Sequence, residues 1–457
     1  MEKKKEAREV DLGSGSVGRL LFQLAVPAIT AQIINVLYNM VDRMYIGHLP
    51  GEGANALTGV GVTFPVIMAI SAFAALVSMG GAPRASIMLG KGKKEEAEHI
   101  LGNCTTALVA VAVMLTVFFL LFGRRILLVF GASGNTIEYG WAYMQIYSLG
   151  TIFVQLALGL NAFINAQGYA KTGMLTVLIG ALCNIILDPI LMFGFHMGVR
   201  GAALATIISQ GISAAWVVLF LISGKSYLRI RLCYMKPHRK ILMPAIALGA
   251  SPFVMQFTES ILNICFNTSL LKYGGDVAVG AMTIMGSVMQ FSLLPLQGLT
   301  QGAQPIISFN YGAKKLDRVS RTFWLLLLCC LIYSTALWSI AMFAPMVYIR
   351  IFTQDAALTS FSIWSIRIYM AASLLFGAQL ACQQTFIAIG DSKTSLFLGL
   401  LRKVILLIPL IYILPHFFGN KVLAVFIAEP IADTIAVCTT VTMFILSFRK
   451  MKRELAS

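Results

Sequence analysis

Long apolar stretches alternate with short polar ones along the whole chain. Each stretch is roughly 20 to 30 residues long, the length that a tilted α-helix needs to cross a bilayer. This is unlike the weak alternating pattern of a transmembrane β-barrel. The pattern therefore predicts an all-α polytopic membrane protein with about twelve transmembrane helices. The predicted segments are residues 18–47, 55–82, 99–122, 138–166, 172–194, 200–223, 241–271, 277–305, 321–349, 361–388, 395–418 and 422–447.

The two halves of the chain repeat each other. Residue types recur at a separation of 224 near the start of each half and of 222 farther along. The matching pairs include Gln32 and Gln256, Asn39 and Asn263, Pro83 and Pro305, Gly90 and Gly312, Phe130 and Phe352, and Tyr147 and Tyr369. Each half has an even number of crossings, so both repeats have the same orientation in the membrane. We predict two six-helix lobes that are related by a pseudo-twofold axis along the membrane normal and enclose a central cleft.

The loops define the predicted domain boundaries and the orientation. The parts are an N-terminal tail (1–17), an N-terminal lobe (18–223), an inter-lobe loop (224–240), a C-terminal lobe (241–447) and a C-terminal tail (448–457). Lys and Arg gather in the tails and in the loops after the second, sixth and eighth segments, which predicts that both termini are cytoplasmic. Arg402 and Lys403 lie inside the eleventh segment. We expect their side chains to extend to its cytoplasmic end.

Composition supports the membrane assignment. The 457 residues are 58% hydrophobic and 12% charged, whereas soluble domains are about 25% charged. The net charge of +16 comes from cations in short loops, which indicates positive-inside orientation and not a nucleic-acid partner. The first apolar stretch is too long for a cleaved signal, so we predict a multi-pass protein of the cell (plasma) membrane. The eight cysteines show no CxxC or Cys/His spacing that would predict a disulfide or metal site.

Motifs for chemistry are absent from the sequence. It contains no GxxxxGK[ST], GxSxG or HExxH pattern. We therefore predict that the chain is not an enzyme, needs no cofactor and draws any transport work from an ion gradient. Nothing in the sequence suggests an obligate protein partner, so we expect a monomer in the lipid bilayer.

A polar stripe marks the first segment. Gln32, Asn35, Asn39 and Asp42 share one helix face. A carboxylate at bilayer depth is costly unless it faces protein or water, so Asp42 is predicted to face a cavity. Pro27 removes one backbone hydrogen bond from the same helix and is a candidate hinge.

Further polar groups lie in the fifth and sixth segments. Asn184 and Asp188 are one helical turn apart, and Thr206 belongs to a polar face of the next segment. If Asp42 and Asp188 approach each other, their repulsion favours uptake of a proton, or of a small cation such as sodium when both are ionised.

The C-terminal half has its own polar stripes. We treat six residues as a candidate substrate or second cation site: Gln256, Glu259, Asn263, Gln301, Gln304 and Asp433. Asparagine and glutamine side chains in membrane helices also serve as interhelical hydrogen-bond partners, which is the alternative for this set. Asp433 and its neighbour Glu429 could instead lie at a helix end.

Ordered sequence motifs resemble a known family. They are Ala25-Val26-Pro27 and Tyr38-Asn39-Met40-Val41-Asp42, Ala82-Pro83-Arg84-Ala85-Ser86 with Leu89-Gly90-Lys91-Gly92, Asn184-Ile185-Ile186-Leu187-Asp188-Pro189, and Gly302-Ala303-Gln304-Pro305 with Asn310-Tyr311-Gly312-Ala313. In order and spacing they are similar to multidrug and toxic compound extrusion (MATE) transporters, in particular the bacterial DNA-damage-inducible-like branch. The resemblance covers nearly the whole chain.

The resemblance implies an antiporter that exports amphipathic, often cationic compounds in exchange for protons or sodium by alternating access. It implies an N-lobe cation site, and its residues match Asp42, Asn184, Asp188, Tyr143 and Thr206. It also implies bending of the first helix at Pro27. Some relatives place an acid pair in the C-lobe, but here the tenth segment offers Tyr369, Gln379 and Gln383 and no acid.

A second function remains open at this point. Lipid or lipid-linked saccharide flippases belong to the same broad superfamily and share the two-lobe design. Such proteins more often carry basic groups in the cleft, whereas the intramembrane charges here are mainly acidic. The sequence therefore favours drug export.

Overall fold

A computed structural model describes residues 11–352 and 356–456, and these residues form helices and connecting loops without a β-strand. The longer helices of the first half are α1 (Val17–Gly47), α2 (Gly53–Gly90), α3 (Lys94–Val129), α4 (Ile137–Leu149), α5 (Thr151–Ala166), α6 (Ala170–Pro189) and α7 (Gly198–Ile222). The second half contains α8 (Arg239–Gly312), α9 (Leu316–Phe343), α10 (Met346–Phe352), α11 (Ala356–Tyr369), α12 (Phe376–Ile389), α13 (Ser392–Leu400), α14 (Ile408–Ile413) and α15 (Lys421–Ala456). Short helical turns of both halves complete the fold: η1 (Ile190–Gly194), η2 (Leu232–Tyr234), η3 (Ser373–Leu375), η4 (Leu401–Leu407) and η5 (Leu414–His416).

The predicted number of spans is confirmed. Within the described residues, ten helices are long and apolar enough to cross a membrane, or twelve if two bent pairs each count as one span. The bent pairs are α4 with α5, at 58°, and α11 with the segment 373–389, at 46°. The long helix α8 contains two spans that meet at Gly275, where φ is 65° and ψ is −163°. Glycine adopts this backbone conformation at little cost, so the chain can reverse there without a longer loop.

Two predicted helix ends are wrong. The second segment was expected to end at residue 82, before Pro83, and the eighth at Pro305, but α2 continues to Gly90 and α8 to Gly312. A proline removes one helical hydrogen bond and the rest of the helix can continue past it. Likewise, α15 continues to Ala456, so the residues after 447 extend the last helix.

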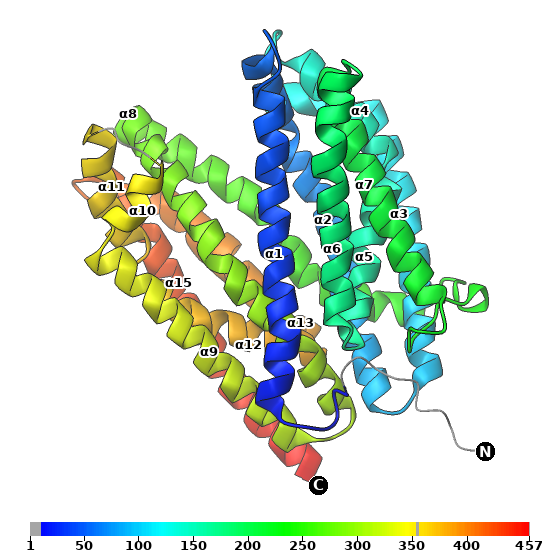
Figure 1. The fold of residues 1–457 in the computed structure, drawn as a ribbon. Helices are drawn as coiled ribbons and strands as arrows, with labels where there is room; N and C mark the ends of the chain where they lie inside the picture. The colour runs from blue at the N-terminus through cyan, green and yellow to red at the C-terminus, as the bar shows by residue number, and fades with distance from the viewer. Residues whose placement is uncertain (1–10, 353–355, 457) are drawn as a thin grey trace.

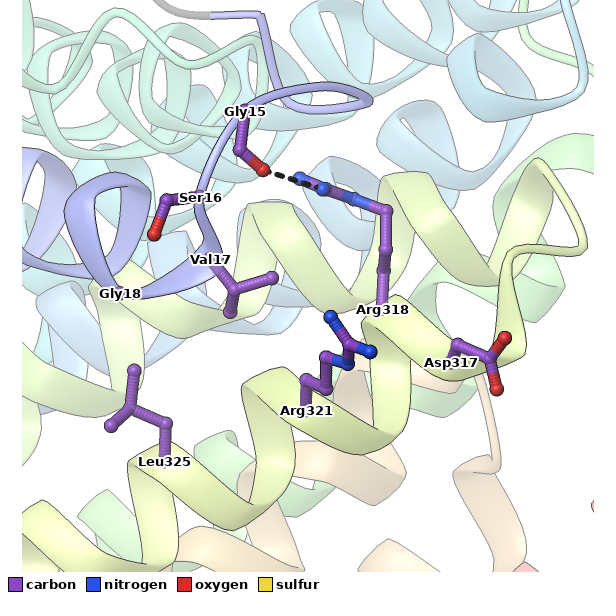
Figure 2. A pocket seen from close by; sticks show the side chains of 8 residues that line it. All are labelled: Gly15, Ser16, Val17, Gly18, Asp317, Arg318, Arg321 and Leu325. Carbon is purple, nitrogen blue, oxygen red and sulfur yellow. Dashed lines mark hydrogen bonds between the residues drawn. The ribbon is translucent and has the colours of Figure 1, made fainter.

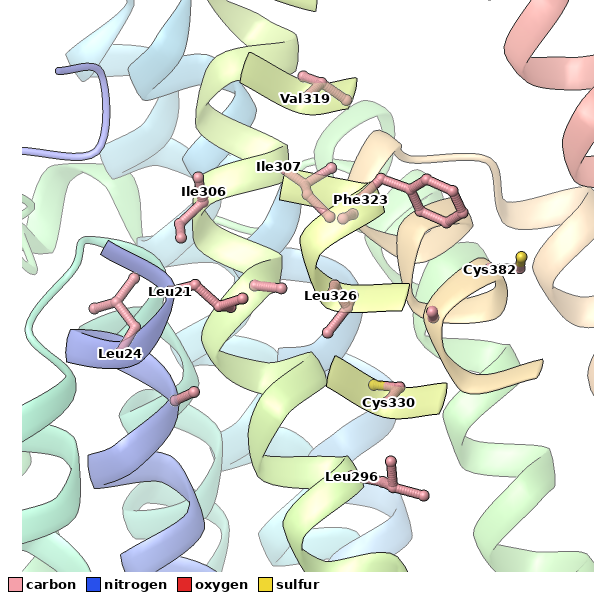
Figure 3. Close-up of a cluster of buried hydrophobic side chains, with 14 of the residues drawn as sticks. Leu21, Leu24, Leu296, Ile306, Ile307, Val319, Phe323, Leu326, Cys330 and Cys382 are labelled. Carbon is pink, nitrogen blue, oxygen red and sulfur yellow. The ribbon is translucent and has the colours of Figure 1, made fainter. Parts of the chain in front are cut away.

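The helices form two lobes, α1–α7 and α8–α15, that diverge from one end of the molecule (Figure 1). That end holds the start of α1 and the end of α15, and we call it the closed end. There, the first turns of α1 pack into the core of the C-lobe. Figure 3 shows Leu21 and Leu24 of α1 beside Ile306 of α8, in one buried cluster with Phe323 of α9.

Glycines allow the lobes to touch backbone to backbone at the closed end. A side chain on Gly90 of α2 would collide with the backbone carbonyl of Phe309 in α8, and one on Gly312 of α8 would collide with that of Ile87 in α2. The two contacts are equivalent in the repeat, because 87 plus 222 is 309 and 90 plus 222 is 312. The pseudo-twofold axis therefore passes through this contact.

Each lobe also binds the peptide that leads into the other lobe. Arg318 of α9 donates hydrogen bonds to the carbonyls of Gly15 (2.7 Å) and Ser14 (3.0 Å), and Asn310 donates one to the carbonyl of Leu12 (2.8 Å). We call this contact of residues 12–15 the first latch. Figure 2 shows the Arg318 side chain reaching Gly15 beside a cavity of about 650 Å³ that Arg321 and Leu325 also line.

The second latch holds the inter-lobe loop against α3. Asn103 accepts a hydrogen bond from the His238 backbone N–H (2.6 Å) and donates one to the Tyr234 carbonyl (3.1 Å). Arg231 forms a salt bridge of 2.9 Å with Glu98, which is buried. The two latches thus tie the lobes together at the closed end, and in each an asparagine amide donates to a carbonyl of the bound peptide.

Candidate functional site

Two acids meet inside the N-lobe. Asp42 lies in the C-terminal part of α1 and Asp188 in the last turn of α6, and their carboxyl groups lie next to each other. Asp42 is 8% exposed and Asp188 is fully buried. Asp188 is followed by Pro189 and the π-helical turn η1, an irregularity of the kind often found at functional sites. The structure thus meets the condition on which the expected uptake of a proton or cation depends.

The other predicted N-lobe residues surround the acid pair. Asn184 donates to an Asp188 carboxyl oxygen at 3.2 Å and lies 3.4 Å from the Thr206 hydroxyl. The buried Tyr143 lies against both Asp42 and Thr206. Five side chains from α1, α4, α6 and α7 are therefore brought together from four separate helices.

Among the described residues, three acceptor oxygens of this cluster have no donor, and no base neutralises its acids. Asp42 Oδ1, Asp188 Oδ2 and Asn184 Oδ1 are buried and accept no hydrogen bond in the structure. In the described part of the chain, no Lys or Arg lies within salt-bridge distance of either acid. Buried acceptor oxygens of this kind suit a shared proton or a small hard cation with oxygen ligands. The described residues contain no cluster of three His, Cys, Asp or Glu side chains that would hold a transition metal.

The C-lobe acids are paired. Asp433 of α15 forms a salt bridge of 2.5 Å with Arg402, and Glu429 lies 3.4 Å from the same guanidinium group. Glu259 of α8 pairs with Lys403. Our expectation that Arg402 and Lys403 extend to the cytoplasmic end is wrong, because a carboxylate within the lobe offers each cation a closer partner.

The six predicted C-lobe residues do not form one cluster. Asp433 is 1% exposed and faces Arg402 inside the lobe, and α15 continues on both sides of it, so it does not lie at a helix end. Glu259 and Asn263 are exposed on the first span of α8. The remaining members, Gln256, Gln301 and Gln304, are half-buried along both spans of α8.

Sequence reasoning did not assign three residues to their sites. Tyr38 lies one turn before Asp42 and next to its carboxyl group, and that spacing on one helix was the available signal. Arg402 and Lys403 were noticed but not paired. Their signal was the presence of both acids and bases within predicted spans of the same half of the chain.

The helix α1 continues without a break through the candidate hinge. Pro27 is buried within a continuous α1, one residue from the exposed Val26. Thr30 donates its hydroxyl to the Val26 carbonyl at 2.9 Å. A hinge at Pro27 therefore stays a prediction.

Comparisons with known proteins agree with this architecture. The family model MatE matches residues 27–190 and 252–413, one match in each lobe. The multidrug export protein MepA of Staphylococcus haemolyticus is 25% identical over 433 residues, covering 94% of this chain and 93% of that protein. MepA of Staphylococcus aureus strain N315 is 26% identical over 414 residues, covering 88% of each.

Solved structures show the same fold. A MATE crystal structure in the bent conformation superimposes with a TM-score of 0.92 over 100% of both chains at 22% identity. The MATE multidrug transporter DinF-BH, solved as a complex, is 31% identical with a TM-score of 0.88, covering 97% of this chain and 98% of that one. With two matched lobes, an all-helical membrane fold and full-length coverage, the chain belongs to the MatE family of membrane transporters.

Proposed function

We propose that the protein is a multidrug efflux antiporter that exchanges amphipathic, often cationic compounds for protons or sodium. The observation that carries the coupling is the N-lobe pair of Asp42 and Asp188, with three acceptor oxygens that no donor satisfies. The names of the MepA relatives and of the multidrug transporter DinF-BH support drug export as the transported class.

The proposed orientation follows from the positive loops. With both termini cytoplasmic, the closed end is the cytoplasmic end, so the lobes diverge toward the outside. The similarity to an outward-facing MATE family transporter, with a TM-score of 0.90, fits this state. The proposed setting is a monomer in the cell membrane.

The mechanism is alternating access. In the outward-facing state an external proton or sodium ion binds between Asp42 and Asp188 and relieves their repulsion. Loss of that negative charge weakens the attraction for a cationic substrate in the cleft, which is released outside. The coupling requires only that the ion and the substrate differ in affinity for the two states or compete. Bending of α1 at Pro27 belongs to the same proposal.

A flippase is the alternative, and one observation bears on it. Arg402 and Lys403 are basic groups at bilayer depth, the feature expected for holding a pyrophosphate. Both are occupied by carboxylates of their own lobe, so neither is free to bind a phosphate group. The drug antiporter is therefore the better supported function.

The test uses vesicles of defined sidedness and a fluorescent cationic dye. A proton gradient and a sodium gradient are imposed separately on the native chain, on Asp42→Asn and on Asp188→Asn. Gradient-driven efflux by the native chain is expected to fall about tenfold or more in both variants, because the coupling free energy of such sites is typically 1–3 kcal/mol. Asp317→Asn, at an exposed acid of α9, is the matched control and should transport normally.

The gradient that drives efflux identifies the coupling ion. Undiminished efflux in both variants would reject the N-lobe site. No dye movement under either gradient, together with movement of a labelled lipid, would instead favour the flippase.

A further inference from the structure

Lys403 of η4 lies at the contact between two parallel helical segments of the C-lobe, the first span of α8 and the segment formed by α13 and η4. The Ser251 hydroxyl of α8 donates to the Ser395 carbonyl of α13 at 2.9 Å, and Lys403 pairs with Glu259 eight residues farther along both segments. Between these two contacts, Gly399 of α13 faces Ser251 and Met255 of α8. At 1.5 Å per residue, the Lys403 pair lies about 12 Å deeper in the membrane than the serine contact.

The two partners of this ion pair differ in exposure. The side chain of Lys403 is 6% exposed, and its ammonium group also donates to the Met255 carbonyl at 3.2 Å. The side chain of Glu259 is 59% exposed. The cation is therefore fixed in the wall of the lobe, while the carboxylate stands at the surface.

The polar residues around Glu259 indicate that this surface borders the predicted cleft between the lobes. Asn263 and Asn267 are exposed on the same span of α8, and their repeat counterpart on α1 contains the exposed Asn35 and Asn39. Exposed amides and a carboxylate at bilayer depth are costly against lipid, so this face borders water. A substrate in the cleft can therefore reach Glu259 but not the stem of Lys403.

Arg402, the neighbouring residue, has different ion-pair partners. It binds Asp433 and Glu429 of α15 and lies with its guanidinium carbon 5.0 Å from the ring centre of Phe376. Both acids are at least 93% buried. Arg402 and its two acids connect helices inside the lobe. In the Lys403 pair, by contrast, Glu259 is accessible to a ligand.

We propose that Lys403 is a specificity-determining residue that acts as a built-in counter-ion for Glu259. In the resting cleft its ammonium group occupies the carboxylate that would otherwise attract a cation. A cationic substrate that binds at Glu259 must share or displace this ammonium group, which keeps its bond to the Met255 carbonyl. Lys403 thus weakens binding in proportion to the positive charge of the ligand, and so favours neutral and singly charged compounds over dications. This inference rests on the proposed function for its substrate class.

The test measures equilibrium binding to the purified chain, without any gradient, by fluorescence anisotropy. The probes are a neutral, a monocationic and a dicationic fluorophore of similar size. Lys403→Met is expected to tighten binding of the monocation about fivefold, which corresponds to about 1 kcal/mol for an ion pair with an exposed partner. The dication should gain more, and the neutral probe should not change.

Matched variants assign the effect to the pair. Glu259→Gln combined with Lys403→Met removes both charges and should abolish the gain for both cations. Lys272→Met makes the same substitution at an exposed position of α8 and should leave all three affinities unchanged. Lys403→Gln keeps a donor for the Met255 carbonyl and gives the same prediction if Lys403→Met does not fold.

Equal changes for all three probes, or no change for the cations, would show that Lys403 only connects helices and would overturn the proposal. This failure is distinct from failure of the antiporter function. A native chain that binds the dyes but moves none under a gradient would reject the proposed coupling and leave the charge dependence of binding intact.

Discussion

The two lobes descend from the same repeat but treat acids inside the membrane in opposite ways. In the N-lobe, Asp42 and Asp188 lie side by side without an ion pair. In the C-lobe, Glu259, Glu429 and Asp433 are each paired with a base from η4. The same architecture thus accommodates an acid pair without a base in one half and an ion-paired network in the other.

The repeat offsets show where the halves diverged. The repeat counterpart of Asp42, 224 positions later, is Phe266, and that of Asp188, 222 positions later, is Leu410. The acid pair therefore has apolar counterparts in the C-lobe. Subtracting 222 from Arg402 and Lys403 gives Gly180 and Ala181, so the N-lobe has no bases there. An acid pair remains responsive to protons or cations only where no internal base satisfies it. This difference is the basis for proposing coupling in the N-lobe and charge selection in the C-lobe.

The largest expected effect comes from removing Arg402, the internal base that pairs with two buried acids of the C-lobe. Arg402→Met leaves Asp433 and Glu429 buried without a partner, which costs about 3–5 kcal/mol. Thermal unfolding in detergent should show a large loss of stability. Replacing all three, with Asp433→Asn and Glu429→Gln added, should restore most of it, because neutral groups need no counter-ion. Unchanged stability of Arg402→Met would contradict the prediction that Arg402 neutralises these buried acids.

A smaller effect is expected at a contact where the two lobes remain equivalent. Gly90→Ala and Gly312→Ala each force a methyl group against a carbonyl of the other lobe, at a cost of about 1–3 kcal/mol. Both should open the closed end to a similar extent. Distances between spin labels at Lys91 and Lys314, in a background without the exposed Cys233 and Cys438, report the opening.

The glycine prediction has a matched control. Gly61→Ala and Gly286→Ala place the same methyl group where no atom lies within 4 Å. They should leave the label distance unchanged. Opening by only one of Gly90→Ala and Gly312→Ala would break the equivalence of the two contacts.

The smallest effect is expected at the latches. Arg318→Ala removes the hydrogen bonds to the carbonyls of residues 12–15, and Glu98→Gln removes the charge that Arg231 contacts. Because Arg318 and Arg231 are partly exposed, each change should shift the balance toward opening of the closed end by about 1 kcal/mol. The same label distances measure it. If neither variant changes them, the latches only anchor the loops.

Much of the fold could be predicted because hydropathy and repetition are properties of the chain itself. The spans, the two lobes and the N-lobe cluster around Asp42 and Asp188 were visible as long apolar runs and helical polar stripes. The helix ends at Pro83 and Pro305 were missed because a proline does not reveal whether the helix continues. The bend between α4 and α5 was missed because the apolar run continues through Gly150.

The sequence by itself determined the class of protein, the duplication and the residues that carry charge into the membrane. Those features depend on the free energy of each segment in lipid, which composition and length set locally. Only the tertiary structure decided that Lys403 neutralises Glu259, that Arg402 neutralises Asp433, and that Asp42 and Asp188 have no such partner. Partners depend on how each helix is rotated and packed against its neighbours, and helical periodicity specifies a face without specifying what lies opposite it.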